Sequence, residues 1–432
     1  MNGGRAEAAP ERPRQGIVLS GGGAKAAYEV GVLKALCGGK SPATGYEPLV
    51  PHICAGTSAG AFNATFLVSQ LDAHGPAAVG NLETVWLERL SGRGLSSENG
   101  VFRFRGDPLS LLDPARYDPS PLGPFVDLAR DSASLFWDGL NRAICLATQR
   151  EGDFRQRFVE LVDLSSFIST EPFERTIREV IDFGSIRRCK TLSRVATTNW
   201  ATGESRFFVN REMTDRQGPL AVLASAAMPG IFPPVFIGAE PHVDGGILMN
   251  TPLRLVTHHA DTIHVVYLDP AVQAIPIAAL QSAASAMYRQ QTISWAKTLK
   301  DDVQDAEAIN EGLLLVERVT RGESPQDLDP EKLTWALKKI WERVHRRVPY
   351  HLLTVHLYRP ADDLGGGPLG LLNLERGHIE ELIRRGFEDA ALHDCAKDGC
   401  VLPGRGWPAS PAARAPWGRP APRERTRGRP PA

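Results

Sequence analysis

Two short apolar runs, each followed by a glycine-rich turn and a helical pattern, stand near the start of the chain. The first run is Ile17–Leu19, and after its glycines apolar residues recur at the three- and four-residue spacing of a helix as far as Leu36. The second run, Val50–Ala55, also leads through a glycine turn into a helical stretch. Repeated strand, turn and helix are typical of a parallel sheet with helices on its faces. We therefore expect a three-layer α/β/α fold with a mostly parallel central sheet.

Later segments predict a hairpin, a further strand and several helices. The runs Val195–Trp200 and Arg206–Val209 flank Thr202-Gly203-Glu204, which predicts a hairpin. The apolar run Ile263–Leu268 predicts another strand. Helices are predicted at Ala221–Ala227, Gln281–Val319, Glu331–Arg347 and Asn373–Ala396.

Composition divides the chain into four parts. Residues 1–15 are polar and contain two prolines, which predicts a disordered lead-in. Residues 16–270 carry the α/β pattern, interrupted from about 91 to 191 by a proline-punctuated insertion that we expect to cover the sheet. Residues 271–402 predict a mainly helical part packed on this domain. Residues 403–432 are rich in proline and arginine and are expected to be disordered.

The charge is unevenly distributed along the 432 residues. The net charge is −1, but seven arginines and one glutamate from Pro403 onward give the end of the chain +6, which leaves −7 on the rest. An acidic body argues against nucleic-acid binding, which needs basic residues gathered on the fold. No apolar run approaches the roughly 18 residues of a membrane-spanning helix, and no apolar secretory leader is visible at the start.

The six cysteines, at positions 37, 54, 145, 189, 395 and 400, are scattered and form no C-x-x-C motif. In a chain of this length, scattered thiols predict small buried hydrophobic side chains in a reducing compartment. We therefore expect a cytoplasmic location, with no metal site and no cofactor.

The strongest chemical signal is Gly56-Thr57-Ser58-Ala59-Gly60, a G-x-S-x-G motif between a strand and a helix. A nucleophile elbow requires this context, because the flanking glycines allow a sharp turn that leaves the serine hydroxyl exposed. The following helix places its positive end near the charge that develops on a substrate. The alternative is a turn whose serine only caps the helix. We favour catalysis, with Ser58 as the nucleophile.

A glycine triplet, Gly21–Gly23, follows the first strand and precedes a helix. Consecutive glycines in this position expose backbone amides that bind an anion. One function is an oxyanion hole, in which removal of one donor costs about 10²–10³ in rate. The other is dinucleotide binding, since Gly21, Gly23 and Ala26 satisfy G-x-G-x-x-A. That motif requires an acidic residue at the end of the second strand, and Glu47 precedes the strand instead.

A third motif, Asp244-Gly245-Gly246, follows the strand-like residues His242 and Val243. Asp-Gly is also the commonest turn dipeptide, so a plain turn is the simple alternative. At the end of a strand, however, the glycines leave room for a serine hydroxyl to approach the carboxylate. Asp244 is therefore a candidate base.

Taken in order, these motifs resemble the patatin-like phospholipase family. Smaller matches lie at residues 28–33, 225–230 and 250–252, and the resemblance covers about residues 16–269, with the insertion as its poorest part. Ala26 stands where the family usually has glycine, which bears on how tightly the loop packs against the helix. Lys25 stands where arginine or lysine is common.

The resemblance implies a lipid acyl hydrolase of the phospholipase A or esterase type, with a Ser58–Asp244 dyad and no required metal. Burial would raise the pKa of the aspartate toward the working range, so that it can act as the base. The glycine-loop amides would stabilise the tetrahedral oxyanion, and water would then release the fatty acid from an acyl-serine. The residues expected at the oxyanion hole or in support are Gly21, Gly22, Gly23, Lys25, Gly56, Gly60, Gly245 and Gly246.

Two alternatives stay open. An α/β-hydrolase uses serine, aspartate and histidine in that order, and the histidines that follow Asp244 include those at positions 258, 259, 264, 351, 356, 378 and 393. A catalytically silent lipid- or nucleotide-binding module would keep the glycine loop for phosphate capture and use Ser58 only as a helix cap.

The expected partner is a phospholipid or another lipid acyl ester, with peripheral contact to a membrane and none to nucleic acid. Phe125, Phe136 and Trp137 in the insertion are candidates for that contact. The basic end of the chain is another, because a polybasic stretch gains about 1 kcal/mol per Lys or Arg near an anionic leaflet.

Overall fold

The computed structural model describes residues 13–92, 99–105, 129–133, 136–137, 168–270, 283–321, 334, 351–365 and 370–403. Part of what the sequence predicts falls outside these ranges. This part comprises the lead-in up to residue 12, most of the insertion including Phe125, nearly all of the predicted helix at 331–347, and the chain after residue 403.

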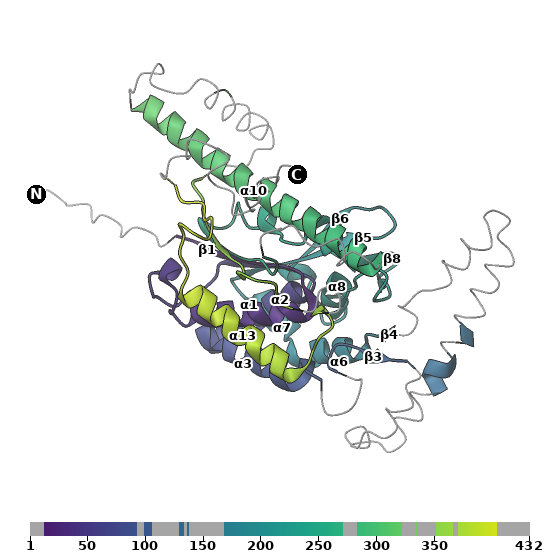
Figure 1. The fold of residues 1–432 in the computed structure, drawn as a ribbon. Helices are drawn as coiled ribbons and strands as arrows, with labels where there is room; N and C mark the ends of the chain where they lie inside the picture. The colour runs from purple at the N-terminus through teal and green to yellow at the C-terminus, as the bar shows by residue number, and fades with distance from the viewer. Residues whose placement is uncertain are drawn as a thin grey trace, which may run out of the picture.

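An eight-stranded sheet lies at the centre of the molecule (Figure 1). Its strand order is β10-β9-β1-β2-β5-β8-β7, and β6 also pairs with β5. The strands from β10 to β5 are parallel, whereas β6, β8 and β7 are joined by antiparallel pairing. The bounds are β1 Gln15–Leu19, β2 Ile53–Thr57, β5 Leu192–Asn199, β6 Ser205–Val209, β7 Val235–Ile237, β8 Glu240–Asp244, β9 Thr262–Val266 and β10 Thr354–Tyr358; a separate pair is β3 Arg103–Phe104 and β4 Ile168–Ser169.

Helices connect and cover these strands. The α-helices in the described ranges are α1 Ala27–Cys37, α2 Ala59–His74, α3 Ala78–Val85, α6 Glu171–Val180, α7 Phe183–Arg188, α8 Gln217–Ser225, α9 Gly246–Met249, α10 Ala283–Thr320 and α13 Arg376–Ala391. Short helical turns are η1 Gly23–Ala26, η2 Pro42–Thr44, η3 Gly75–Ala77, η4 Trp86–Leu90, η8 Asn210–Glu212 and η9 Leu253–Leu255. No helix in the described ranges combines the length and the apolar character that a bilayer crossing requires.

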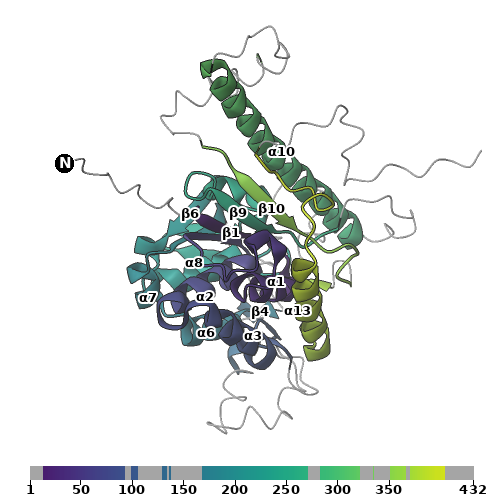
Figure 2. The same ribbon diagram turned by 90° about the vertical axis from the view of Figure 1, so that its left-hand side faces the viewer.

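The alternation of side chains along each strand creates two apolar cores, one on each face of the sheet. In β1, Ile17 and Leu19 belong to the core that contains the buried residues of α1 and α2, whereas Val18 belongs to the core that contains Leu299 of α10. Figures 1 and 2 show α10 on one face and α1, α2 and α13 on the other. The expected three-layer α/β/α architecture with a mostly parallel sheet is therefore confirmed.

The last described helix, α13, packs tightly against the first, α1. A Cβ atom at Gly31 would lie 1.9 Å from the Ile383 carbonyl oxygen, and one at Gly386 would lie 2.0 Å from the Tyr28 carbonyl oxygen. Only glycine allows the two backbones to approach this closely. Residues from the two ends of the described chain therefore form one layer beside the glycine loop.

Some predicted boundaries are wrong, for identifiable reasons. The strand predicted from Val50 begins at Ile53, and it continues to Thr57, directly before the serine of the G-x-S-x-G motif. The helix predicted from Ala221 begins at Gln217, because Pro219 falls in its first turn, where a missing amide hydrogen costs nothing. The helix predicted to end at Ala396 stops at Ala391. The predicted hairpin is confirmed as the antiparallel pair β5 and β6.

Candidate active site

Ser58 lies in the sharp turn between β2 and α2. Its backbone angles, φ 56° and ψ −131°, fall in a region that residues other than glycine rarely adopt. The turn also depends on its glycines, since a Cβ at Gly56 would lie 2.2 Å from the Gly60 carbonyl oxygen. The Ser58 amide donates a hydrogen bond to Ser225 Oγ at 2.9 Å, and its side chain makes no capping hydrogen bond to α2. The turn has the sharp strand-to-helix geometry that a nucleophile elbow requires, and the Ser58 side chain does not cap the helix.

The strand register brings Asp244 to this turn. Thr57, the last residue of β2, pairs with Ala196 of β5, while Asp244, the last residue of β8, pairs with the next residue of β5, Thr197. Strand β6 occupies the opposite edge of β5 over residues 194–198, so β2 and β8 share one edge. Because β2 is parallel to β5 and β8 is antiparallel to it, their carboxyl ends meet. Ser58 and Asp244 are therefore neighbours.

The carboxyl group of Asp244 is buried, and hydrogen bonds make up only part of the hydration that it loses. Its Oδ1 accepts a hydrogen bond from the Gly246 amide at 2.7 Å, whereas Oδ2 has no hydrogen-bond partner among the described residues. Burial raises the pKa of Asp244 to about 7, against the opposing effects of the Gly246 amide and the Ser58 side chain. The close turn needs its glycines, since a Cβ at Gly245 would lie 2.4 Å from the Ala196 carbonyl oxygen. A carboxyl group with this pKa can accept and return a proton near neutral pH.

The glycine loop lies against the same turn. A Cβ at Gly21 would lie 2.9 Å from the Cβ of Ser58. The Gly21 amide, however, donates to the Asn250 carbonyl oxygen at 3.1 Å, and the Asn250 side-chain amide donates back to the Gly21 carbonyl oxygen at 3.1 Å. The Gly21 amide is thus already paired. This differs from the expectation that the amides of all three glycines are free to bind an oxyanion. Within the described ranges, the amides of Gly22 and Gly23 have no protein acceptor.

The side chain of Lys25 ties the glycine loop to three residues later in the chain. Its ammonium group is buried and lies 2.9 Å from a carboxylate oxygen of Asp363, 3.2 Å from the Tyr288 hydroxyl and 3.8 Å from a carboxylate oxygen of Asp269. Burial by itself would lower the pKa of Lys25, but Tyr288, Asp269 and Asp363 raise it above its usual value. The lysine does not line the cavity beside Ser58. Its place fits a structural support of the loop.

A largely apolar pocket, partly open to solvent, adjoins Ser58 and Gly23. Its walls come from η1, α2, η4, α6, α8 and the segments 226–235 and 371–374. Aromatic and aliphatic side chains dominate the lining, among them Phe62, Trp86, Phe173, Leu223 and Phe232. Ser58 and Thr170 are the hydroxyl-bearing residues of this lining. An apolar lining of this kind suits the hydrocarbon part of a ligand.

Several residues that position the site were not assigned a role from the sequence. Ser225 Oγ accepts from the Ser58 amide and donates to the Ala196 carbonyl oxygen at 2.6 Å, which fixes the elbow to β5. Thr251 Oγ1 lies 2.8 Å from Ser20 Oγ, next to the paired Gly21 and Asn250. Ser225 and Thr251 fall in the short family matches at 225–230 and 250–252. Their positioning roles, however, depend on hydrogen-bond partners in other segments of the chain.

A buried polar network under the loop was also not anticipated. Glu29 Oε2 accepts from the Asn63 side chain at 2.9 Å, and Asn63 Oδ1 accepts from Trp86 Nε1 at 2.8 Å. Burial raises the pKa of Glu29 well above its ordinary value, although Asn63 and the Ser20 backbone oppose the shift. The signal for this network in the sequence is Glu29, a carboxylate on an otherwise apolar helix face.

The histidines in the described ranges do not form a triad with Ser58 and Asp244. Among the described residues, neither the cavity lining nor the hydrogen-bond partners of Asp244 include a histidine. His264 is buried in β9 against the Tyr358 hydroxyl, and His351 contacts the Ala260 carbonyl oxygen. Of the aromatic residues expected in the insertion, Phe136 and Trp137 are exposed and in edge-to-face contact.

The comparison with family models identifies the family of this chain. The family model described as patatin-like phospholipase matches residues 17–257, more than half of the chain. The crystal structure of VipD from Legionella pneumophila is similar at 17% sequence identity and a TM-score of 0.31, over 89% of this chain and 68% of VipD. Among curated proteins, none matches the chain. The chain belongs to the patatin-like phospholipase family, and this membership implies lipid acyl hydrolase activity.

Proposed function

We propose that the chain hydrolyses acyl esters of phospholipids or related membrane lipids through a Ser58–Asp244 dyad. The observation that carries the proposal is the strained Ser58 turn, held beside a buried carboxyl group at the mouth of an apolar cavity. Backbone strain of this kind costs on the order of 1–3 kcal/mol and persists where the surrounding structure over-determines it, as at functional sites.

Acylation begins with proton transfer from the Ser58 hydroxyl to Asp244, whose unpartnered Oδ2 is the available acceptor. The serine oxygen forms a bond to the ester carbonyl carbon, and the carbonyl oxygen becomes an oxyanion. The amides of Gly22 and Gly23 are the donors that we assign to this oxyanion, since Gly21 is paired with Asn250. The tetrahedral intermediate then expels the alcohol, which takes the proton from Asp244 and leaves an acyl-serine.

Deacylation repeats the same steps with water. Asp244, again ionised, takes a proton from a water molecule whose oxygen attacks the acyl carbon. The intermediate collapses, the fatty acid leaves, and the proton returns from Asp244 to the Ser58 oxygen. A base with a pKa of about 7 serves both directions, because it gains and loses its proton at little cost near neutral pH.

The substrate class follows from the cavity and its surroundings. The apolar walls accommodate an acyl chain, and the ester lies where the chain emerges beside Ser58. Exposed Phe236 adjoins the lining residue Val235, and exposed Phe104 contacts Phe102, which in turn contacts the lining residue Phe232. We propose that these aromatic side chains give the site peripheral contact with a membrane. The described cysteines are free thiols, which fits a cytoplasmic location.

The test is a hydrolysis panel on the full chain, with phosphatidylcholine vesicles and a soluble short-chain ester as substrates. We expect Ser58→Ala to lower kcat/KM by at least about 10⁴-fold, and Asp244→Asn to lower it by about 10²–10⁴-fold. The exposed Ser205→Ala and Asp215→Asn serve as matched controls and keep wild-type rates. Circular dichroism establishes that each variant is folded.

The same panel separates the alternatives. A histidine variant at position 258, 259, 264, 345, 351, 356, 378 or 393 that is folded yet inactive would favour a triad. A folded wild type that hydrolyses neither substrate would favour a silent lipid- or nucleotide-binding module. The dyad requires activity in the wild type and its loss in both Ser58→Ala and Asp244→Asn.

A further inference from the structure

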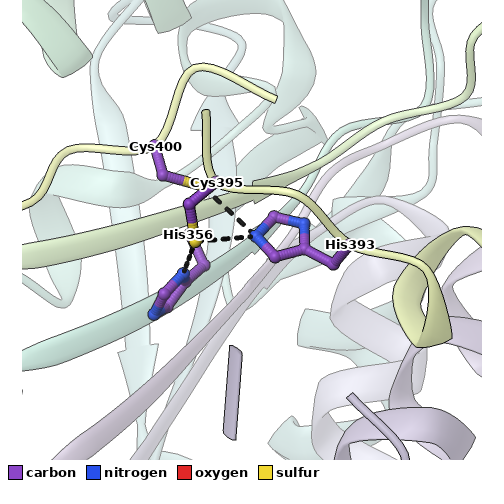
Figure 3. Close-up of side chains that lie close together, drawn as sticks. All are labelled: His356, His393, Cys395 and Cys400. Atoms are coloured by element: carbon purple, nitrogen blue, oxygen red, sulfur yellow. Dashed lines mark hydrogen bonds between the residues drawn. The ribbon is translucent and has the colours of Figure 1, made fainter. Parts of the chain in front are cut away.

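Two histidines and two cysteines converge at the edge of the sheet, away from Ser58. His356 comes from β10, and His393, Cys395 and Cys400 come from the segment that follows α13 (Figure 3). One ligand atom from each lies within 4.8 Å of all the others. Both histidines are buried, and both cysteines are free thiols. Imidazole nitrogen and thiolate sulfur are the ligands that zinc prefers in proteins.

The spacing of these atoms fits one tetrahedral ion. Cys395 Sγ lies 3.4 Å from His356 Nδ1 and 3.5 Å from His393 Nε2, and Cys400 Sγ lies 3.3 Å from the same His393 nitrogen. With Zn–S of about 2.3 Å and Zn–N of about 2.0–2.1 Å, a tetrahedral site places sulfur and nitrogen about 3.6 Å apart. The four side chains thus need only small adjustments to share a zinc ion.

Hydrogen bonding alone accounts poorly for the arrangement at His393. Its Nδ1 lies 2.8 Å from Asp398 Oδ2, which also accepts from the Asp394 amide at 2.9 Å. A neutral imidazole that donates from Nδ1 has a single lone pair on Nε2, and two sulfur atoms point at it. A metal ion between the three atoms uses that lone pair and both thiolates together. A carboxylate on the far nitrogen of a ligating histidine is a frequent partner in zinc sites.

The backbone around the cluster supports the same interpretation. Cys400 Sγ accepts a hydrogen bond from the Leu357 amide at 3.4 Å, which suits a thiolate. Beside it, Val401 and Val355 exchange backbone hydrogen bonds of 2.8 Å in each direction, so that the segment after α13 covers the edge strand β10. Four protein ligands are typical of a structural zinc site and not of a catalytic one.

From this geometry we infer that His356, His393, Cys395 and Cys400 bind one structural Zn²⁺ ion. The ion links the segment after α13 to β10, and it thereby holds the last described part of the chain against the sheet. The inference is independent of the reaction at Ser58. The scattered cysteines, which form no C-x-x-C motif, led to the expectation of no metal site, and the inferred zinc site replaces that expectation. One of its ligands comes from a strand, and the other three have the spacing His-x-Cys-x₄-Cys.

The first experiment measures metal content. The full chain, produced in zinc-supplemented medium without an affinity tag that binds metal, is dialysed and analysed by elemental mass spectrometry. We expect about one zinc per chain in the wild type and a tenfold or greater loss in Cys395→Ser and Cys400→Ser. Cys189→Ser, a thiol outside the cluster, should keep its zinc. Asp398→Ala should bind zinc about 10–100-fold more weakly, since this residue only positions His393.

A second measurement does not depend on folded variants. Addition of Co²⁺ to the chelator-treated, reduced wild type should produce a thiolate-to-cobalt charge-transfer band and the intense visible absorption of a tetrahedral site. Thiol titration after unfolding should find Cys395 and Cys400 reduced. The inference is overturned if the wild type retains no zinc and shows no cobalt band, if a Cys395–Cys400 disulfide is found, or if folded Cys395→Ser and Cys400→Ser retain zinc as the wild type does.

Discussion

The buried carboxyl group of Asp244 should make the protein less stable as the pH rises, and Asp244→Asn should remove this effect. Burial raises the pKa from an ordinary 3.8 to about 7 in the folded protein. A group whose pKa is raised on folding contributes its full stability below the unfolded pKa and loses it as the pH rises through the folded pKa. The ionised aspartate therefore destabilises the fold above pH 7, where the proposed reaction at Ser58 needs it.

The magnitude follows from the two pKa values. At 1.36 kcal/mol per pH unit, the whole difference between pKa 3.8 and about 7 corresponds to about 4 kcal/mol. About 2.6 kcal/mol of this falls between pH 5 and pH 8. Asparagine is neutral throughout, so Asp244→Asn carries no such pH dependence. The variant should gain about 2.6 kcal/mol in free energy of unfolding relative to the wild type over that range, while losing its activity.

The assay is urea unfolding of both proteins at pH 5, 6, 7 and 8, followed by tryptophan fluorescence. Subtraction of the wild-type free energy at each pH cancels groups that the two proteins share. Asp182→Asn is the matched control, because hydrogen bonds to Ser185 lower the pKa of Asp182 and confine its contribution to acid pH. Its difference from the wild type should stay flat from pH 6 to 8. A flat difference for Asp244→Asn from pH 5 to 8 would refute the reasoning.

Three further predictions follow from the same contacts. The kcat/KM for a soluble ester should rise with pH to a plateau, with an apparent pKa of about 7, because Asp244 must be ionised to act as a base; a profile that is flat from pH 5 to 9 contradicts this role. Lys25→Met should lower the free energy of unfolding by about 3–5 kcal/mol, since it leaves the buried Asp269 without its ammonium partner. The double variant Lys25→Met/Asp269→Asn should regain part of this lost stability, and urea titration measures the free energy of unfolding of both variants. Deletion of residues 403–432 should weaken binding to anionic vesicles while soluble-ester hydrolysis is kept, and unchanged vesicle binding would dismiss the role of the basic end.

Local patterns predicted most of the fold, and they singled out the three motifs to which we assign the proposed chemistry. Apolar runs followed by glycine turns located β1 and β2, and their context predicted the sharp turn at Ser58. These features depend on neighbouring residues, which the sequence displays directly. Boundaries were less accurate where a single residue decides them, as Pro219 does in the first turn of α8.

The features that escaped prediction depend on pairing between distant segments. Asp244 reaches Ser58 because β8 pairs with β5 one position beyond the end of β2, and no local pattern records that register. Likewise, the Gly21 amide is taken by Asn250, which lies far along the chain. The His–Cys cluster was overlooked for the same reason, since β10 supplies His356 and the chain after α13 supplies the rest.

The pairing of Ser58 with Asp244 is tested most directly by the rate and position of labelling with a fluorophosphonate probe. The probe forms a covalent bond with an activated serine, and peptide mass spectrometry locates it. We predict a single modification, on Ser58, whose rate falls by about 10²–10⁴-fold in folded Asp244→Asn. Modification of another residue, no modification of the folded wild type, or an unchanged rate in Asp244→Asn would contradict the dyad.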